Sequence, residues 1–301
     1  MQNKILLIVV LILAGFYNIQ RGFNNKKTSF SSEKIIMLDT KTDTTKTLEM
    51  ENYLIGVIAA EMPASFEKEA LKAQAIAARS FAYYKINTRN GEYDLTNDIT
   101  TQAYIEKESM KEKWQDKYEY YYEKIKTAVN ETKDLVLVYD NKIISAYYFS
   151  MSNGKTENAS LVFNEDKNYL VSVESSEPVT SNNFKVTKVI STDEFCQKLN
   201  ITQPVKIDKI NKSQSGRINS IRINNIEFVG TTIRKLLNLR STDFEISIDG
   251  ASIYIKTKGY GHGVGMSQYG ANEMAKNGSA YDDILYHYYT GVKIANINSI
   301  N

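Results

Sequence analysis

Residues 53–84 read YLIGVIAAEMPASFEKEALKAQAIAARSFAYY, and this stretch decides the fold of the surrounding chain. Ahead of Pro63 the apolar residues recur at helical spacing, which predicts a helix over residues 51–61. Pro63 ends this helix, because proline lacks a main-chain donor and pushes its predecessor out of the helical region. A second helix is predicted over residues 67–87.

The sequence on either side predicts an α+β fold with a β-rich body and a helical lobe over about residues 49–134. Residues 34–38 and 45–48 are typical of a hairpin, and residues 106–132 form a charged, tyrosine-rich helical stretch. Short strands and helices alternate after that. Strands are expected at 135–139, 143–149, 185–190, 205–210, 217–223, 244–248 and 253–257, and helices at 193–199, 231–237, 266–276 and 281–289.

The amino terminus carries an uncharged apolar run, residues 5–17. This is the length of the apolar part of a signal peptide, and it is shorter than the ~20 residues of an ordinary spanning helix. We interpret residues 1–27 as a signal-anchor segment with a polar linker, and residues 28–301 as the folded domain. The expected location is the cell membrane, with a single pass and the domain outside the cytoplasm. Cleavage of the segment would make the protein secreted, and a buried terminal helix is the other alternative.

Composition excludes several classes of function. The net charge is +2, but residues 1–27 hold four basic residues and no acidic ones, so the rest of the chain is slightly acidic. Nucleic-acid binding needs clustered positive charge and is not expected. A single cysteine cannot form an internal disulfide, and two histidines are too few for an ordinary zinc site without carboxylates. We predict no cofactor and no metal.

The helix expected from residue 67 carries polar residues on two sides. At ~100° per residue, Lys72, Arg79 and Tyr83 fall within about 40° of one another, whereas Gln74 lies opposite. These side chains either form a solvated basic face or place donors over a groove.

Glu61 ends an apolar helix next to the proline break. Apolar surroundings and the negative end of the helix dipole both disfavour the ionised carboxylate, and so would raise its pKa toward the range of a general acid. The alternative is an exposed glutamate at a helix end.

Three blocks together resemble the stage II sporulation protein D family: residues 53–84, LLNLRSTDFEI at 236–246, and GYGHGVGMSQYGANEMAKNG at 259–278. The resemblance implies an exported, membrane-anchored lytic transglycosylase that acts on peptidoglycan strands stripped of stem peptides, during engulfment in sporulation. It implies that Glu61 is the acid. The residues it implies as supporting activity are Lys72, Gln74, Arg79 and Tyr83.

One essential carboxyl group suits such chemistry. Hydrolytic glycosidases generally use two carboxylates. In a lytic transglycosylase the C6 hydroxyl of N-acetylmuramic acid attacks its own anomeric carbon, so no water has to be activated. Glu61 would protonate the leaving oxygen and then accept the hydroxyl proton, giving a 1,6-anhydro end. Lys72 or Arg79 could hold a lactyl carboxylate, and Tyr83 could stack on a sugar.

The glycine-rich segment at residues 261–271 does not match a dinucleotide loop, because its sixth position is Met266. Its glycines instead predict close backbone approach to the helix or to a glycan. His262, Ser267 and Gln268 are then either wall-binding residues or structural residues of the turn.

Zinc, which some relatives bind, is not supported by this sequence. The segment YDLTNDITTQAY at residues 93–104 holds neither cysteine nor histidine, and Phe149 and Met151 occupy the second ligand region. Glu157, in the polar loop at 152–158, is interpreted as a solvated surface carboxylate.

A different class of function competes with the enzyme: a non-catalytic wall-binding protein that stimulates an amidase, as in the related amidase enhancers. A metal-dependent amidase is disfavoured by the lack of a histidine cluster. The resemblance implies peptidoglycan strands as the partner, together with a sporulation amidase (stage II sporulation protein P) and the membrane protein stage II sporulation protein M.

Overall fold

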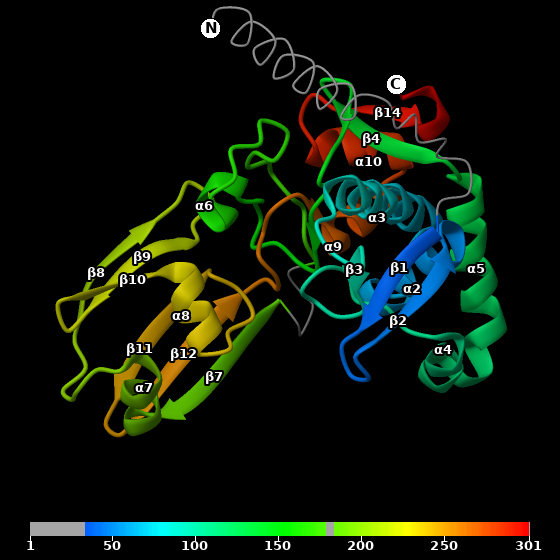
Figure 1. The fold of residues 1–301 in the computed structure, drawn as a ribbon. Helices are drawn as coiled ribbons and strands as arrows, with labels where there is room; N and C mark the ends of the chain where they lie inside the picture. Colours follow the sequence, from blue (N-terminus) through cyan, green and yellow to red (C-terminus); the bar gives the residue numbers. More distant parts are fainter. Residues whose placement is uncertain (1–33, 179–183, 301) are drawn as a thin grey trace, which may run out of the picture.

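A computed structural model describes residues 34–178 and 184–300 (Figure 1). The expected signal-anchor segment, residues 1–27, lies outside the described residues. Within the described ranges, no helix combines the length and the apolar character needed to cross a membrane. Helices and several small sheets are mixed along the chain, so the predicted α+β class is confirmed.

The two helices of the opening stretch form as predicted. Helix α2 covers Met50–Glu61 and α3 covers Lys68–Thr88. Eight of the twelve residues of α2 are buried, including the unbroken run from Tyr53 to Ala59, as the apolar sequence of this run requires. The break between the helices is a turn closed by the N–H of Phe66, which donates to the carbonyl of Pro63 at 3.0 Å.

The flanks of α2 are a small sheet and a helix pair. Strands β1 (Lys34–Asp39) and β2 (Thr44–Glu49) form the expected hairpin, and β3 (Leu95–Thr96) adds in parallel to β1. The expected helix over residues 106–132 is divided in two, because Gln115 has a positive φ of 49° that a helix cannot contain. The result is α4 (Lys107–Trp114), a 3-10 turn (Gln115–Lys117) and α5 (Tyr118–Glu131).

The same body also contains residues 135–163 and, from much later in the chain, residues 266–299. The expected strand at 143–149 is interrupted, since only its two ends pair with neighbouring strands. The other elements of the body are β4 (Leu135–Tyr139), β5 (Lys142–Ile143), β6 (Tyr148–Phe149), α6 (Ala159–Phe163), β13 (Met266–Ser267), α9 (Gln268–Lys276), α10 (Tyr281–Tyr288), β14 (Lys293–Asn296) and a 3-10 turn (Ile297–Ser299).

Residues 185–258 form a second lobe with its own apolar core, on the left of Figure 1. One sheet has the strand order β11-β12-β7 and the other β10-β9-β8. The elements are β7 (Lys185–Ser191), α7 (Thr192–Leu199), β8 (Ile207–Lys212), β9 (Ile218–Ile223), β10 (Ile226–Val229), α8 (Gly230–Leu236), β11 (Phe244–Asp249) and β12 (Ser252–Lys258).

The two cores do not divide the chain at residue 134, where the sequence placed the edge of a helical lobe. Val129 of α5 shares one core with Val136 of β4 and Leu285 of α10, so the helices and the C-terminal elements are one body.

Glu157 lies at the junction of the body with the second lobe. It is 3% exposed and accepts hydrogen bonds from Ser213 at 2.5 Å and Ser215 at 2.7 Å, which corrects its interpretation as a solvated carboxylate.

Candidate active site

Glu61 is the last residue of α2, and its side chain is partly buried. The main-chain N–H of Ala103 donates to its Oε1 at 3.0 Å. Burial raises the pKa of the Glu61 carboxyl above its ordinary value, and the Ala103 hydrogen bond opposes the shift only in part. The surroundings therefore favour the protonated carboxyl group, while the N–H of Ala103 can still stabilise the ionised carboxylate.

A buried polar group lies beside Glu61. The Tyr53 hydroxyl donates to Oε1 of Gln102 at 3.0 Å, and Nε2 of Gln102 donates to the Tyr148 hydroxyl at 2.9 Å and to the carbonyl of Ala78 at 3.3 Å. Burial raises the pKa of both tyrosines, and the nearby charge of Glu61 raises it further. Both phenols are thus held neutral as potential donors near the carboxyl group.

Sequence reasoning missed these three residues. Tyr53 lies two turns before Glu61, about 80° away around the helix, and this spacing could have identified it. Gln102 and Tyr148 come from an irregular segment and an interrupted strand. Neither segment has a periodicity that would show which side chain turns toward α2.

Gln74 and Gln268 are brought together. Nε2 of Gln268 lies 3.5 Å from Oε1 of Gln74, and both side chains are buried between α3 and α9. Among the residues that the structure describes, Nε2 of Gln74 has no hydrogen-bond partner. Gln74 lies one turn before Ala78, whose carbonyl accepts from Gln102. This side of α3 therefore faces the polar group beside Glu61.

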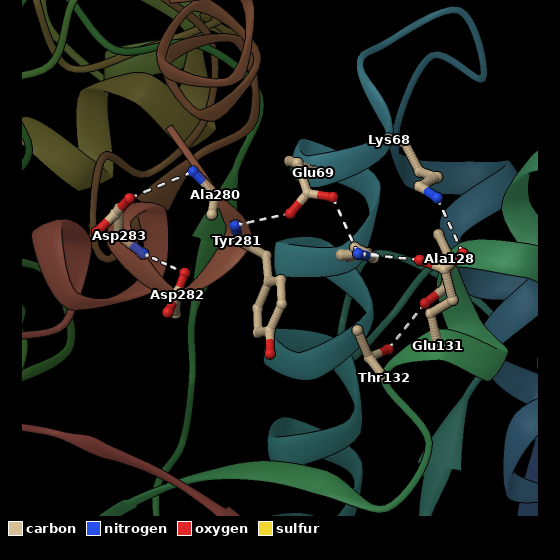
Figure 2. Close-up of polar contacts among 10 residues, drawn as sticks. Lys68, Glu69, Ala128, Glu131, Thr132, Ala280, Tyr281, Asp282 and Asp283 are labelled. Atoms are coloured by element: carbon tan, nitrogen blue, oxygen red, sulfur yellow. Dashed lines mark hydrogen bonds and ion pairs between the residues drawn. The ribbon is translucent and has the colours of Figure 1, made fainter. Parts of the chain in front are cut away.

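Lys72 lies on another side of α3. Its ammonium lies 2.9 Å from carboxylate oxygens of both Glu69 and Glu131 and 5.3 Å from the centre of the Tyr281 ring. Figure 2 shows the two carboxylates, one from α3 and one from the end of α5, with Tyr281 alongside. The lysine side chain is 14% exposed, so its charge is already neutralised at a helix junction.

Arg79 and Tyr83 lie on the same side as Lys72. Arg79 is fully buried and pairs with Glu51, and Tyr83 is 3% exposed. In the described part of the chain, neither Lys72 nor Arg79 has a hydrogen bond or ion pair with Glu61. The binding of a sugar by Lys72, Arg79 and Tyr83 stays a prediction from the sequence.

His262 and Ser267 make structural contacts in the glycine-rich segment. Nε2 of His262 donates to the carbonyl of Tyr148 at 3.0 Å, while Nδ1 accepts from the N–H of Val264 at 3.1 Å. Burial, helped by the charge of Arg234, lowers the pKa of His262 to about 3. Ser267 caps α9 by accepting from the N–H of Gly270 at 3.3 Å. These contacts favour the structural alternative for both residues.

No group of three or more histidine, cysteine, aspartate or glutamate side chains is placed to hold a metal ion among residues 34–178 and 184–300. The absence of zinc stays a prediction from the sequence.

Fold and site together define an α+β protein with a candidate acid-catalysis site at Glu61. A family model described as stage II sporulation protein matches residues 38–139. Stage II sporulation protein D of Bacillus amyloliquefaciens is 41% identical over 86% of this chain and 78% of its own length. The protein of the same name from Bacillus subtilis (strain 168) is 41% identical over 85% and 77%. The amidase enhancer of Bacillus subtilis (strain 168) is 29% identical over 80% of this chain and 40% of its own length.

The chain belongs to the stage II sporulation protein D family, a family of sporulation proteins.

Proposed function

We propose that this protein is a lytic transglycosylase that cleaves the bond between N-acetylmuramic acid and N-acetylglucosamine in amidase-stripped peptidoglycan, remodelling the septal wall during engulfment in endospore formation. The observation that carries the proposal is the partly buried carboxyl group of Glu61, whose pKa is raised by its surroundings. A raised pKa keeps the group able to donate a proton near neutral pH.

The reaction needs Glu61 in both protonation states. Its carboxyl proton goes to the glycosidic oxygen as the C1–O bond breaks, and the C6 hydroxyl of the same muramic acid forms the new bond to C1. The Glu61 carboxylate then takes the proton of that hydroxyl. Because nucleophile and electrophile belong to one sugar, orientation supplies much of the rate. Burial favours the neutral acid, and the N–H of Ala103 stabilises the carboxylate formed after the first transfer.

The polar group beside Glu61 has a positioning role in this proposal. Gln102 is held from both ends by Tyr53 and Tyr148, so the two phenols are fixed relative to α2. Fixed donors near a reacting carboxyl group lose little energy to reorganisation during the reaction.

A second candidate function is a non-catalytic enhancer of a peptidoglycan amidase. The observation that favours it is the 29% identity to a protein named amidase enhancer. Proteins of either kind bind the wall, so binding alone does not separate them.

Location and partners follow as proposals from the same function. We place the domain outside the cytoplasm, held by the N-terminal segment at the engulfing membrane. Its proposed partners are a sporulation amidase of the stage II sporulation protein P type, which would supply the stripped strands, and stage II sporulation protein M.

Product analysis tests the enzyme. The purified full-length protein is incubated with amidase-treated peptidoglycan, and the released fragments are examined by mass spectrometry for 1,6-anhydro ends. We expect such ends with the wild type, none with Glu61→Gln, and a wild-type yield with Glu92→Gln, which alters an exposed carboxylate elsewhere. Wall binding without anhydro ends in the wild type rejects the enzyme and supports the enhancer.

A further inference from the structure

Two lysines reach the end of α2 from the neighbouring helix pair. Lys113 of α4 donates from Nζ to the carbonyl of Ala59 at 2.8 Å, in the same helical turn as Glu61. Lys124 of α5 donates from Nζ to the carbonyl of Ser65 at 3.3 Å and to that of Phe66 at 2.5 Å. The two ammonium groups therefore contact the chain just before and just after Glu61.

Neither ammonium group has a carboxylate oxygen within 4.0 Å among the described residues, although Lys68, Lys72 and Lys126 nearby do. Partial burial lowers the pKa of Lys113 and of Lys124, and only Glu67 acts against this at Lys124. A carbonyl satisfies one ammonium donor and leaves the unit charge uncompensated. Both lysines thus carry a partly desolvated charge at the C-terminal end of α2, which ends in Glu61, and the turn that follows it.

We propose that Lys113 and Lys124 bind the free lactyl carboxylates of the glycan strand and so select strands from which the stem peptides have been removed. This inference rests on the proposed function for its substrate class. Removing the stem peptide converts the lactyl amide, which is neutral, into a carboxylate on every muramic acid. An ammonium group forms stronger hydrogen bonds to a carboxylate than to an amide. The lysines therefore recognise the one group that distinguishes stripped from intact strands.

The alternative role is purely structural: Lys113 and Lys124 would only fasten α4 and α5 to the turn after α2. The two roles predict different responses to charge. If the lysines are purely structural, replacing them lowers the affinity for charged and neutral ligands equally. If they recognise a carboxylate, replacing them lowers the affinity only for the ligand that carries the carboxylate.

Binding measurements in the Glu61→Gln background separate these roles without requiring turnover. The probes are soluble oligomers of alternating N-acetylglucosamine and N-acetylmuramic acid with free carboxylates, and the same oligomers with every carboxylate converted to a methylamide. We expect the Glu61→Gln protein to bind the carboxylate oligomers about tenfold or more tightly than the methylamide oligomers. This difference in affinity should shrink as the salt concentration rises. Lys113→Met and Lys124→Met each reduce the preference several-fold, and together they abolish it.

Matched control lysines lie two residues away on the same helices. Lys111→Met and Lys126→Met remove charges whose side chains lie over tyrosine rings or pair with Glu123, and they keep the full preference. Lys113→Arg and Lys124→Arg restore it, because the charge is kept.

Equal loss of affinity for both probes in the methionine variants overturns the proposal and leaves the structural tie. An unchanged preference overturns it as well. A wild-type protein that discriminates between the probes but yields no anhydro ends refutes the enzyme and keeps the lysine assignment, so the two failures are distinguishable.

Discussion

Arg79 of α3 and Glu51 of α2 form a two-point ion pair, with Nε 3.2 Å from Oε1 and Nη2 2.6 Å from Oε2. The same guanidinium donates to the carbonyls of Leu135 at 3.1 Å and Val129 at 3.3 Å. It is fully buried, so its charge depends on Glu51 for compensation. One side chain thus ties α2, α3, α5 and β4 together, and its role is to hold the body around Glu61.

Arg79→Met is expected to lower the free energy of unfolding by about 3 kcal/mol or more, because it leaves the Glu51 carboxylate without its partner and two buried carbonyls without donors. Chemical denaturation measures the change. Lys68→Met, which breaks an exposed pair with Glu131, should cost no more than ~1 kcal/mol. A variant of Arg79 with wild-type stability and impaired glycan binding would place Arg79 in the substrate site.

Glu61→Gln is expected to stabilise the protein at neutral and alkaline pH. The folded pKa of Glu61 is raised, so the buried charge costs free energy above that pKa and nothing below the ordinary value of ~4.3. Glutamine keeps an acceptor for the N–H of Ala103 and carries no charge. Urea denaturation should show the variant more stable than the wild type at pH 8, with the difference shrinking toward pH 4. A difference that is the same at both pH values would contradict a raised pKa.

Much of the fold and part of the site were predictable from the sequence. Apolar periodicity and one proline place α2 and α3 and put Glu61 at a helix end. The same periodicity groups Lys72 with Arg79 and puts Gln74 on another side. It cannot tell which side faces the site, because that depends on α5, β4 and α9, which pack from distant positions in the chain.

Gln102 illustrates the other limit. Its position is set by three contacts, with Tyr53, Ala78 and Tyr148, which come from three separate elements. No local pattern in the irregular segment around it encodes these contacts. A buried polar residue of this kind is predictable only once the tertiary fold is known.

His262 should make the stability of the protein depend on pH in the acid range. Its folded pKa is about 3, whereas the unfolded chain takes up the proton near pH 6.5. The contribution of neutral His262 is therefore complete above pH 6.5 and is lost as the pH falls, by up to ~1.4 kcal/mol per pH unit. Comparing the pH slope of the unfolding free energy between pH 4 and 6.5 for the wild type and His262→Asn isolates this term. Equal slopes would contradict it.

Gly56→Ala should damage the site from within α2. A Cβ at this position would lie 2.1 Å from Cε2 of Tyr104 and 2.9 Å from the carbonyl oxygen of Ile105, so the segment that carries Ala103 must move away from the helix. Overpacking of this kind costs about 1–3 kcal/mol, more than the helix preference of alanine returns. We expect lower stability together with reduced production of anhydro ends, since Ala103 no longer positions the Glu61 carboxylate.

The control for this variant is Gly91→Ala, because a Cβ there meets nothing within 4 Å. It should leave both stability and product formation unchanged. Adding Tyr104→Ala to Gly56→Ala removes the ring but not the carbonyl of Ile105, so only part of the activity should return. If Gly56→Ala lowers stability while product formation per folded molecule stays at the wild-type level, the contact between Ala103 and Glu61 does not position the acid.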